Sequence, residues 1–359
     1  MSNPIRIVVI GAGKLGTFHG QKIRALEEEL NLEFVGVVDP SESQRVAACR
    51  KLQCRGFADL YDGLLNNIGA AVVAAPTLIH RNLGVTLLSR GIHVLMEKPL
   101  AISSDQTDDL LTASRKSGAI LQVGHVERFN PAFTEAQKHI YQPRYIHSKR
   151  TSGFTFRSID VGVTLDLLIH DIDLVLTLVN SPVINVDAIG RTLVSGHEDI
   201  VQARLTFEND CVADLESSRV SRTPTRCMEV WSEDSFTEID FANRVMSCVH
   251  PDEQVLCGDF DVNHLDQDDL NYFHEKLMDE MLPQMSRSFA SVDALELEMR
   301  DFVRSIVSGR APRVTGQAGA EAVVVAEKII NSIKRNQQVL HRFAPMPEVF
   351  RIEDYRKAV

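Results

Sequence analysis

Short apolar segments and helical patterns alternate through the first 124 residues. Apolar runs predict strands at residues 5–10, 34–38, 71–75, 93–96 and 120–123. Most of these runs are continuous rather than alternating, as expected for parallel strands that are buried on both faces. Helical periodicity falls between them, at residues 15–30, 42–52, 82–90 and 105–117. This order predicts an α/β domain with a doubly wound parallel sheet.

The pattern changes after Gly124. Helical stretches at residues 131–140 and 164–179 lead into segments of alternating apolar and polar residues, at 185–194, 200–207, 211–220 and 226–231. Such alternation is typical of a largely antiparallel sheet with one open face. Beyond it we expect a charged loop with a helical end at 259–279, helices at 292–308 and 318–336, and a tail at 345–359. Because 359 residues are also many for one core, we predict two domains, residues 1–124 and an α+β domain of residues 125–359.

Three glycines, Gly11, Gly13 and Gly16, follow the first predicted strand in a Gly-x-Gly-x-x-Gly pattern. Between a strand and a helix, this motif is typical of Rossmann domains that bind dinucleotides. Gly11 permits the tight turn, Gly13 lets a pyrophosphate approach the backbone, and Gly16 allows the helix to pack closely on the sheet. Lys14 and Leu15 complete the loop, whose free N–H groups at the helix N-terminus favour phosphates.

Asp39 ends the second predicted strand, where a carboxylate can accept hydrogen bonds from the adenosine ribose. Its charge would repel a 2′-phosphate, so the sequence favours NAD over NADP as the cofactor. Arg45, in the next predicted helix, is the counter-argument, because a guanidinium there is in reach of a phosphate. Without a cofactor, these residues would form a structural glycine turn and a solvated aspartate.

Two further strand ends carry candidate residues. Ala75-Pro76-Thr77 follows the third strand and should line the cofactor cleft, and His80 either joins it or lies on a helix face. Glu97-Lys98-Pro99 ends the fourth strand, at the edge where open α/β sheets bind their ligands. A lysine at such a buried position is unfavourable unless a bound molecule uses its charge.

Polar residues form a stripe along the otherwise apolar stretch at 164–179. On a regular helix, Asp166, His170, Asp173 and Thr177 share one face. A helix that is apolar almost all round is buried, so this stripe must face a cavity or a buried polar network. An aspartate four residues before a histidine can hold the imidazole and raise its basicity, which suits a general base. The alternative is a purely structural carboxylate–histidine pair.

Composition narrows the classes of partner. The formal net charge of −11 at pH 7 argues against general polyanion binding, and so against a nucleic acid as partner. No apolar run approaches the roughly 18 residues of a membrane span, and no signal-peptide pattern precedes the first strand. The six cysteines show no metal-like spacing, and Asp166 and His170 lack a convincing third ligand. We therefore expect a cytoplasmic protein with free thiols, no membrane partner and no metal site.

The motifs occur together in one known family. The chain resembles the Gfo/Idh/MocA oxidoreductases, the family of glucose–fructose oxidoreductase and inositol dehydrogenase. The resemblance is carried by residues 11–16, 75–77, 97–99, 124–131, 166–173 and 309–316. It implies a Rossmann domain followed by a substrate domain whose open sheet packs against another subunit, in a homodimer or homotetramer. It also implies reversible hydride transfer between a sugar or polyol hydroxyl and a nicotinamide.

The resemblance assigns roles to matching positions. Lys98 would lie beside the nicotinamide and the reacting carbinol, while His170 would accept the proton with Asp166 supporting it or binding a neighbouring hydroxyl. Which of Lys98 and His170 takes the proton first stays open. Glu97 and Arg128 would lie on the cofactor side. The candidate substrate-binding residues are Lys98, Asn130, Arg157, Asp166 and His170.

A finer resemblance concerns the substrate. Residues 123–131, 157–163 and 217–221 resemble the branch of UDP-N-acetylglucosamine 3-dehydrogenases, which oxidise a nucleotide sugar at C3 for lipid A or surface polysaccharide. The basic residues Arg144, Lys149, Arg150 and Arg157 would then meet a diphosphate, or else form a solvated strand edge. Two alternatives remain: a dehydrogenase of a free polyol or monosaccharide such as an inositol, and a non-catalytic NAD-binding sensor.

Overall fold

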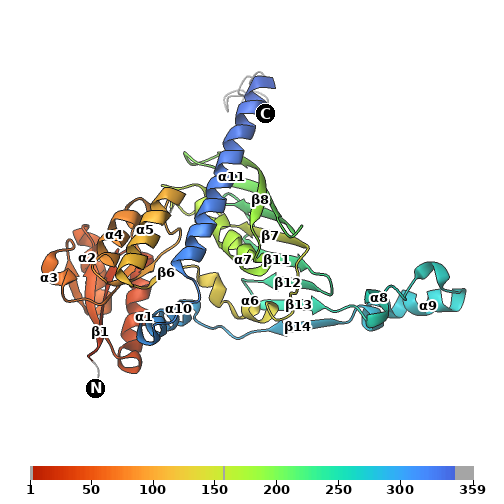
Figure 1. Ribbon diagram of the computed structural model, residues 1–359, viewed down its shortest axis with the longest axis horizontal. Helices are drawn as coiled ribbons and strands as arrows, with labels where there is room; N and C mark the ends of the chain where they lie inside the picture. Colours follow the sequence, from red (N-terminus) through yellow and green to blue (C-terminus); the bar gives the residue numbers. More distant parts are fainter. Residues whose placement is uncertain (1–2, 157, 344–359) are drawn as a thin grey trace, which may run out of the picture.

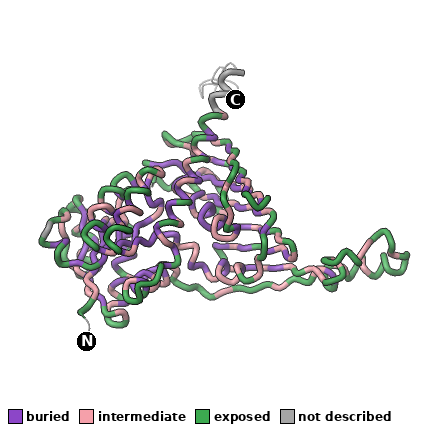
Figure 2. Tube along the Cα trace, in the orientation of Figure 1, coloured by how far each residue is buried: buried purple, intermediate pink, exposed green. Residues whose placement is uncertain are grey.

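Two β-sheets lie side by side in the computed structural model, which describes residues 3–156 and 158–343 (Figure 1). The long C-terminal helix α11 (Gly316–Phe343) runs between them, and a narrow arm extends away from the second sheet. Buried residues concentrate in the two sheets and the helices packed on them, whereas the arm is largely exposed (Figure 2). The predicted tail at 345–359 lies outside the described residues.

The first sheet contains six parallel strands within the described residues, in the order β3-β2-β1-β4-β5-β6. Its strands are β1 (Ile5–Ile10), β2 (Leu32–Val38), β3 (Arg55–Phe57), β4 (Ala70–Val73), β5 (His93–Met96) and β6 (Leu121–Val123). Its helices are α1 (Lys14–Leu30), α2 (Glu42–Leu52), α3 (Asp62–Leu65), η1 (Thr77–Ile79), α4 (His80–Leu88) and α5 (Ser104–Ser117). The predicted Rossmann-type sheet is confirmed. β3 was not predicted because it is short and has no apolar run.

The continuous apolar pattern of β1 has a direct structural cause. Val8 and Val9 are both fully buried, but they belong to separate cores on opposite faces of the sheet. Successive side chains of a strand point to opposite faces, so a sheet covered by helices on both sides needs apolar residues at every position. The second core also includes Phe302 of α10 (Ala294–Ser308), which packs against α1. The domain boundary at residue 124 remains a prediction, and α10 lies on the first sheet although it is far beyond that residue.

The second sheet contains eight strands within the described residues, in the order β14-β13-β12-β11-β7-β10-β9-β8. The strands are β7 (Tyr145–Thr151), β8 (Val183–Arg191), β9 (Ile200–Phe207), β10 (Val212–Ser218), β11 (Thr225–Trp231), β12 (Phe236–Asp240), β13 (Val245–Val249) and β14 (Gln284–Ser288). Only β7 and β10 pair in parallel among these strands. The predicted largely antiparallel sheet is therefore confirmed, but β7, β12, β13 and β14 were not predicted.

One face of this sheet carries helices. The 3-10 turn η2 (Val126–Phe129) and helix α6 (Pro131–Ala136) follow the first domain, and a π-helical turn, η3 (Thr164–Leu168), runs directly into α7 (Ile169–Val179). α11 packs against α7 and β8 and also against α5, so it joins the two halves of the molecule. The prediction of one regular helix over 164–179 is wrong at its start, because the first turn is π-helical. No helix within the described residues is long and apolar enough to cross a membrane.

The arm leaves the sheet after β13 and returns at β14. It contains α8 (Glu253–Leu256), η4 (Val262–His264), α9 (Gln267–Lys276) and η5 (Leu277–Met281). At its neck, His250 N donates a hydrogen bond to Pro283 O at 3.3 Å, and Asp252 N donates to Met281 O at 2.8 Å. The charged segment predicted at 259–279 lies within this arm, with α9 as its helical part.

Candidate active site

A cavity of about 1110 Å³ opens at the carboxyl ends of the first sheet. Its lining includes these residues from the predicted cofactor motifs: Gly11, Gly13, Lys14, Leu15, Asp39, Ala75, Pro76, Thr77, Glu97 and Lys98. It also includes Phe18, Ser41 and Gln44, which were not predicted, and Ser158 and Asp160 from the second domain. The cavity therefore combines both halves of the chain at the place where α/β sheets bind ligands.

The glycines of the first loop differ in what surrounds them. Gly11 has φ +99°, and a Cβ atom there would lie 2.3 Å from Ala74 O. A Cβ atom on Gly16 would lie 1.8 Å from Gly11 O, so this position serves close packing, as predicted. A Cβ atom on Gly13 would meet only Gln44 Oε1, at 3.6 Å, since the backbone faces the cavity. The loop thus has the open backbone surface that a dinucleotide phosphate requires.

Asp39 fastens this loop to the start of α2. Its carboxylate accepts hydrogen bonds from Ala12 N at 2.7 Å and Ser41 N at 2.8 Å. Arg45 Nη1 donates to the backbone oxygen of Asp39 at 2.6 Å. The guanidinium of Arg45 is therefore engaged with the backbone, while the carboxylate of Asp39 lies at the cavity wall.

His80 links two of the loops that border the cavity. The side chain is buried, and its ring nitrogens lie 2.9 Å from Pro99 O and 2.9 Å from Ala75 O. Burial lowers the pKa of His80. Both ring nitrogens thus face backbone carbonyls, and the predicted contact of His80 with the cofactor stays a prediction.

Glu97 lies beneath Lys98 and is almost fully buried. One carboxylate oxygen lies 2.7 Å from His19 Nε2, and the other accepts a hydrogen bond from Lys98 N at 3.2 Å. A Cβ atom on Gly124 would lie 2.9 Å from Glu97 Oε2, which explains the glycine at the end of β6. Burial opposes the ionisation of Glu97, but its interactions with His19 and with Lys98 lower the pKa of its carboxyl group.

Lys98 and Asp166, predicted from distant parts of the chain, are in direct contact. Lys98 Nζ donates to Asp166 O at 2.6 Å and to Asp166 Oδ1 at 3.1 Å. Both side chains keep 18% of their surface exposed. An ammonium group has three donors, so one N–H of Lys98 remains for a ligand in the cavity.

His170 lies near enough to Lys98 to feel its charge but is not paired with Asp166, and neither Asp166 nor His170 belongs to the described lining of the cavity. The carboxylate of Asp166 contacts Lys98, and His170 Nδ1 has no hydrogen-bond partner among the described residues. Burial and then the positive charge of Lys98 hold the pKa of His170 well below its usual value. The prediction that Asp166 raises the basicity of His170 is therefore wrong. The structural reason is that Lys98, from a distant part of the chain, engages the Asp166 carboxylate.

The next acidic residues on this segment form buried ion pairs. Arg128 donates to both carboxylate oxygens of Asp173, at 2.7 and 2.9 Å. Arg150 donates to both oxygens of Asp171, at 2.8 and 2.9 Å, and to Glu127 Oε1 at 2.9 Å. Arg128, predicted on the cofactor side, is thus held by α7.

The predicted basic cluster does not form a single patch. Arg150 is buried in its ion pairs, Lys149 pairs with Glu216 at 2.9 Å, and Arg144 pairs with Glu233. Side chains of consecutive residues on β7 point to opposite faces, which separates Lys149 from Arg150. Arg157 lies outside the described residues.

Both the oxygen and the nitrogen of the Asn130 side-chain amide form hydrogen bonds within the protein. Oδ1 accepts a hydrogen bond from Ala132 N at 3.1 Å and caps α6, while Nδ2 donates to Phe241 O at 3.1 Å. The side chain is 7% exposed. Its predicted contact with the substrate stays a prediction.

His125 is a site residue for which the sequence analysis gave no role. It follows β6 and is buried, and neither ring nitrogen has a partner among the described residues. Its ring lies edge-on to that of His170, with the centroids 6.1 Å apart. Burial lowers the pKa of His125. The signal was available, because His125 follows a parallel strand end at the same sheet edge as Lys98.

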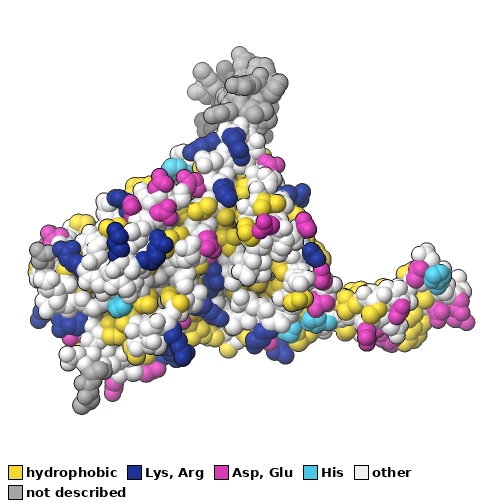
Figure 3. Space-filling view, viewed as in Figure 1, with side chains coloured by type: hydrophobic (Ala, Val, Ile, Leu, Met, Phe, Trp, Pro, Cys, Tyr) yellow, Lys and Arg dark blue, Asp and Glu magenta, His cyan; other side chains and the backbone are white. Residues whose placement is uncertain are grey.

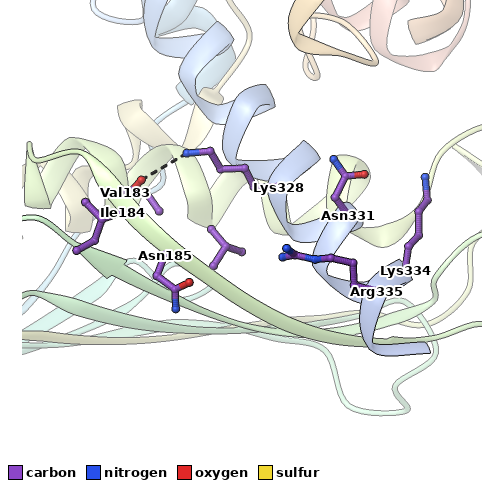
Figure 4. Close-up of a pocket in the computed structure, with 8 residues that line it drawn as sticks. Val183, Ile184, Asn185, Lys328, Asn331, Lys334 and Arg335 are labelled. Atoms are coloured by element: carbon purple, nitrogen blue, oxygen red, sulfur yellow. Dashed lines mark hydrogen bonds between the residues drawn. The ribbon is translucent and has the colours of Figure 1, made fainter. Parts of the chain in front are cut away.

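A second hollow, of about 540 Å³, lies between β8 and α11 (Figure 4). Lys328, Lys334 and Arg335 of α11 border it opposite Val183, and Lys328 Nζ donates to Val183 O at 3.4 Å. Its described lining contains no acid or histidine that could exchange a proton. The chemistry is therefore assigned to the cavity at Lys98.

Comparison with known proteins agrees with this geometry. Residues 5–125 match the model of an oxidoreductase family with an NAD-binding Rossmann fold, and residues 132–235 match the model of a GFO/IDH/MocA C-terminal domain. The chain is 30% identical over 326 residues to UDP-N-acetylglucosamine 3-dehydrogenase of Acidithiobacillus ferrooxidans, covering 90% of this chain and 96% of that protein. The chain belongs to the Gfo/Idh/MocA family. It is therefore an NAD-binding oxidoreductase that acts on CH–OH groups.

Further comparisons include a second substrate class. The chain is 26% identical over 238 residues to scyllo-inositol 2-dehydrogenase (NAD(+)) of Bacillus subtilis, covering 62% of this chain and 69% of that protein. The solved structure of the Acidithiobacillus ferrooxidans enzyme superposes with a TM-score of 0.79 at 28% identity, covering 93% of this chain and 99% of that one. The family thus defines the fold and the reaction type, and the substrate requires its own argument.

Proposed function

We propose that this family member is an NAD-dependent dehydrogenase that oxidises the C3 hydroxyl of a UDP-linked N-acetylhexosamine. The observation that carries the proposal is the match to UDP-N-acetylglucosamine 3-dehydrogenase, which extends over nearly the whole of both chains. The inositol dehydrogenase match covers less of each chain. The match therefore includes the second domain, where the residues that recognise the substrate should lie.

The proposed cofactor is NAD, held along the glycine loop and Asp39. Gly13 leaves room for the pyrophosphate, and the Asp39 carboxylate is placed at the wall where the adenosine ribose would lie. When bound, the nicotinamide supplies the hydride acceptor. NAD is favoured over NADP because a 2′-phosphate would meet the Asp39 charge, while Arg45 is already bonded to the backbone.

Lys98 is the proposed stabiliser of the reacting oxygen. Asp166 holds its ammonium group through two hydrogen bonds, which leaves one N–H for the carbinol oxygen. As the hydroxyl loses its proton, negative charge develops on that oxygen, and a fixed cation beside it lowers the barrier. Glu97, bonded to the backbone of Lys98, fixes the strand end from below.

His170 is the proposed proton acceptor. Its lowered pKa keeps the imidazole neutral at physiological pH, so that one ring nitrogen carries a lone pair. The nitrogen that would accept the proton is Nδ1, which has no hydrogen-bond partner among the described residues. Proton transfer from the hydroxyl to His170 and alkoxide stabilisation by Lys98 then complete the alcohol side of the reaction.

The test uses UDP-N-acetylglucosamine deuterated at C3, with NAD and the full chain. We expect NADH absorbance to rise and the NADH to carry deuterium, measured by mass spectrometry. The undeuterated sugar nucleotide, free N-acetylglucosamine and scyllo-inositol serve as matched comparisons. Unlabelled NADH would exclude C3, and faster turnover of scyllo-inositol would establish the polyol alternative. Absence of turnover with every substrate, together with normal NAD binding, would establish the sensor alternative.

The cofactor preference has a separate test. Dissociation constants for NAD and NADP can be measured on the unmodified chain by calorimetry. Tighter binding of NAD is expected, and tighter binding of NADP would overturn the assignment of Asp39. The result does not depend on finding the substrate.

We also propose a cytoplasmic homo-oligomer, assembled through the open face of the second sheet. Trp231 on this sheet contacts Tyr145 and Phe236, with ring centroids 4.9 and 5.0 Å apart, and remains 37% exposed. All six cysteines are described and are free thiols, as in reducing compartments. Light scattering with Trp231→Glu tests the interface, since loss of the assembly is expected only if this face is buried in it.

A further inference from the structure

Three potential metal ligands converge at the neck of the arm. His250 follows β13, Cys248 is the second-last residue of that strand, and His139 lies just beyond α6. Cys248 Sγ lies 3.3 Å from His250 Nε2, which lies 3.4 Å from His139 Nδ1. All three ligand atoms lie within 4.8 Å of one another. The surface where the arm leaves the body shows histidine side chains in Figure 3.

Hydrogen bonding alone does not account for this arrangement. A neutral imidazole nitrogen carries either one proton or one lone pair, so His250 Nε2 can serve only one of its two neighbours. The sulfur of Cys248 already accepts a hydrogen bond from Thr237 Oγ1 at 3.3 Å. A cation at the centre would satisfy both imidazole lone pairs and the thiolate at the same time.

The distances agree with tetrahedral zinc. Zinc–nitrogen bonds of about 2.05 Å and zinc–sulfur bonds of about 2.3 Å place two nitrogens about 3.4 Å apart, and nitrogen and sulfur about 3.6 Å apart. The observed separations of 3.4 and 3.3 Å are close to these values. Thiolate with imidazole is also a ligand set that selects zinc over magnesium or calcium.

An unpaired carboxylate lies nearby, outside the group of three ligand atoms that lie within 4.8 Å of one another. Asp234 Oδ1 is shielded from solvent and has no hydrogen-bond partner in the described part of the chain. Its negative charge acts on Cys248, and the hydroxyl of the next residue, Ser235, donates to His139 O at 2.9 Å. Asp234 therefore lies in the turn that borders both ligand-bearing segments.

We propose that His139, Cys248 and His250 bind one Zn²⁺ ion per chain, with water as the fourth ligand. The ion would connect the segment after α6 with the end of strand β13. It would also connect both with the neck of the arm, because His250 N donates a hydrogen bond to Pro283 O there. None of these ligands belongs to the described lining of the catalytic cavity. The role is therefore structural. The sequence analysis predicted no metal, since the ligands come from segments more than a hundred residues apart.

The experiment titrates the metal alone into full-length protein that has been treated with a chelator and then freed of it. We expect one Zn²⁺ per chain by elemental analysis. With Co²⁺ as the probe, we expect the visible bands of tetrahedral coordination and a sulfur-to-cobalt charge-transfer band. His250→Ala should lower Zn²⁺ affinity ~100-fold or more, at least what the loss of an outer-shell partner costs.

Two further variants separate binding from folding. His250 is exposed, so its replacement should leave the fold intact, whereas Cys248→Ser should retain weak cobalt binding without the charge-transfer band. Matched controls are His264→Ala, an exposed histidine of the arm, and Cys227→Ser, a half-buried cysteine of β11; neither should change metal binding. Less than stoichiometric Zn²⁺ in the unmodified chain, or unchanged affinity in His250→Ala, would overturn the proposal. These readouts involve no turnover, so they are independent of the proposed reaction.

Discussion

Helix α7 and the π-helical turn before it carry polar groups of two kinds. On α7, the carboxylates of Asp171 and Asp173 are each bonded twice by a guanidinium, and both side chains are buried. These pairs satisfy their charges within the protein, as buried charges require. They join α7 to β7 and to η2, so their contribution is to position the elements around the cavity.

Lys98 at the cavity wall and two buried histidines outside its described lining are incompletely paired. Lys98 keeps one donor free, while His170 Nδ1 and both ring nitrogens of His125 have no partner among the described residues. Each unsatisfied buried polar group in a protein calls for an explanation, and a ligand that completes the hydrogen bonds is one. Asp171 and Asp173 thus have their partners within the protein, and we propose that a bound ligand supplies the partners of Lys98 and His170.

Among the residues at the cavity, Lys98→Ala should have the largest effect on turnover. We expect turnover to fall by about 10²–10⁴-fold, because the variant removes the cation beside the developing alkoxide. Affinity for NAD and the melting temperature should change little, since Lys98 is partly exposed. NADH absorbance, calorimetry and thermal unfolding measure the three quantities. Turnover equal to that of the unmodified chain would remove Lys98 from the mechanism.

Arg150→Met tests whether the buried ion pair with Asp171 stabilises the fold. Removing one member of a buried pair leaves an uncompensated charge, so we expect the free energy of unfolding to fall by about 3–5 kcal/mol. The double variant Arg150→Met with Asp171→Leu should recover part of this loss, because the Asp171 charge is then absent, whereas Glu127 still lacks Arg150. Urea unfolding measures each step. If Arg150→Met is as stable as the unmodified chain, the pair is not holding the scaffold.

Apolar patterns predicted the parts of the fold that are set by local burial. The strands of the first sheet and the segment 164–179 follow from runs such as residues 7–10, which need no knowledge of partners. β7 was not predicted because its inward positions include Ser148 and Arg150, and a buried arginine has no apolar signal. Arg150 is buried only because Asp171 and Glu127 meet it in the folded chain.

In the site, too, contacts between distant residues could not be predicted from the sequence. The glycine loop and Lys98 were predicted because their chemistry is tied to strand ends. The partners of Asp166 and His170 were not, because apolar periodicity does not distinguish a π-helical turn from an α-helical one. Asp166 lies in that turn, and its carboxylate contacts Lys98, which comes from the other half of the chain.

The lowered pKa of His170 also predicts how stability depends on pH. In the unfolded chain a histidine binds a proton as the pH falls below about 6.5, whereas burial beside Lys98 keeps His170 neutral in the native state to lower pH. The unfolded state then binds more protons, so stability should fall as the pH decreases below that value. His170→Asn should reduce this loss, and His264→Asn, at an exposed position on the arm, should not. Urea unfolding at several pH values on both sides of 6.5 measures the difference.

The same pKa shift predicts the activity profile. A general base that remains neutral below its usual titration range keeps kcat/KM constant as the pH falls through about 6.5, and the decrease begins only at lower pH. A decrease centred on the ordinary histidine value would mean that the acceptor is another, solvated group. The profile therefore distinguishes a buried base from an exposed one.

Glu298→Gln should cause the smallest change in stability, and it tests whether an unpaired buried group must belong to the active site. Both carboxylate oxygens of Glu298 are buried without a partner among the described residues, and Glu298, like His125 and His170, is absent from the described lining of the cavity. Burial, and then the charge of Glu97, raises the pKa of Glu298 well above 4.5. As the pH rises above that value, the unfolded chain releases a proton that the native state retains, so the native state loses stability.

Glutamine cannot ionise, so the advantage of Glu298→Gln over the unmodified chain should be absent at acid pH and grow as the pH rises above about 4.5. Urea unfolding across this range measures the advantage, and turnover measured alongside should stay the same. If turnover instead fell as far as in Lys98→Ala, the unpaired carboxyl would belong to the reaction. Missing partners would then mark a catalytic network that extends through Glu97 into the first domain, beyond the wall of the cavity.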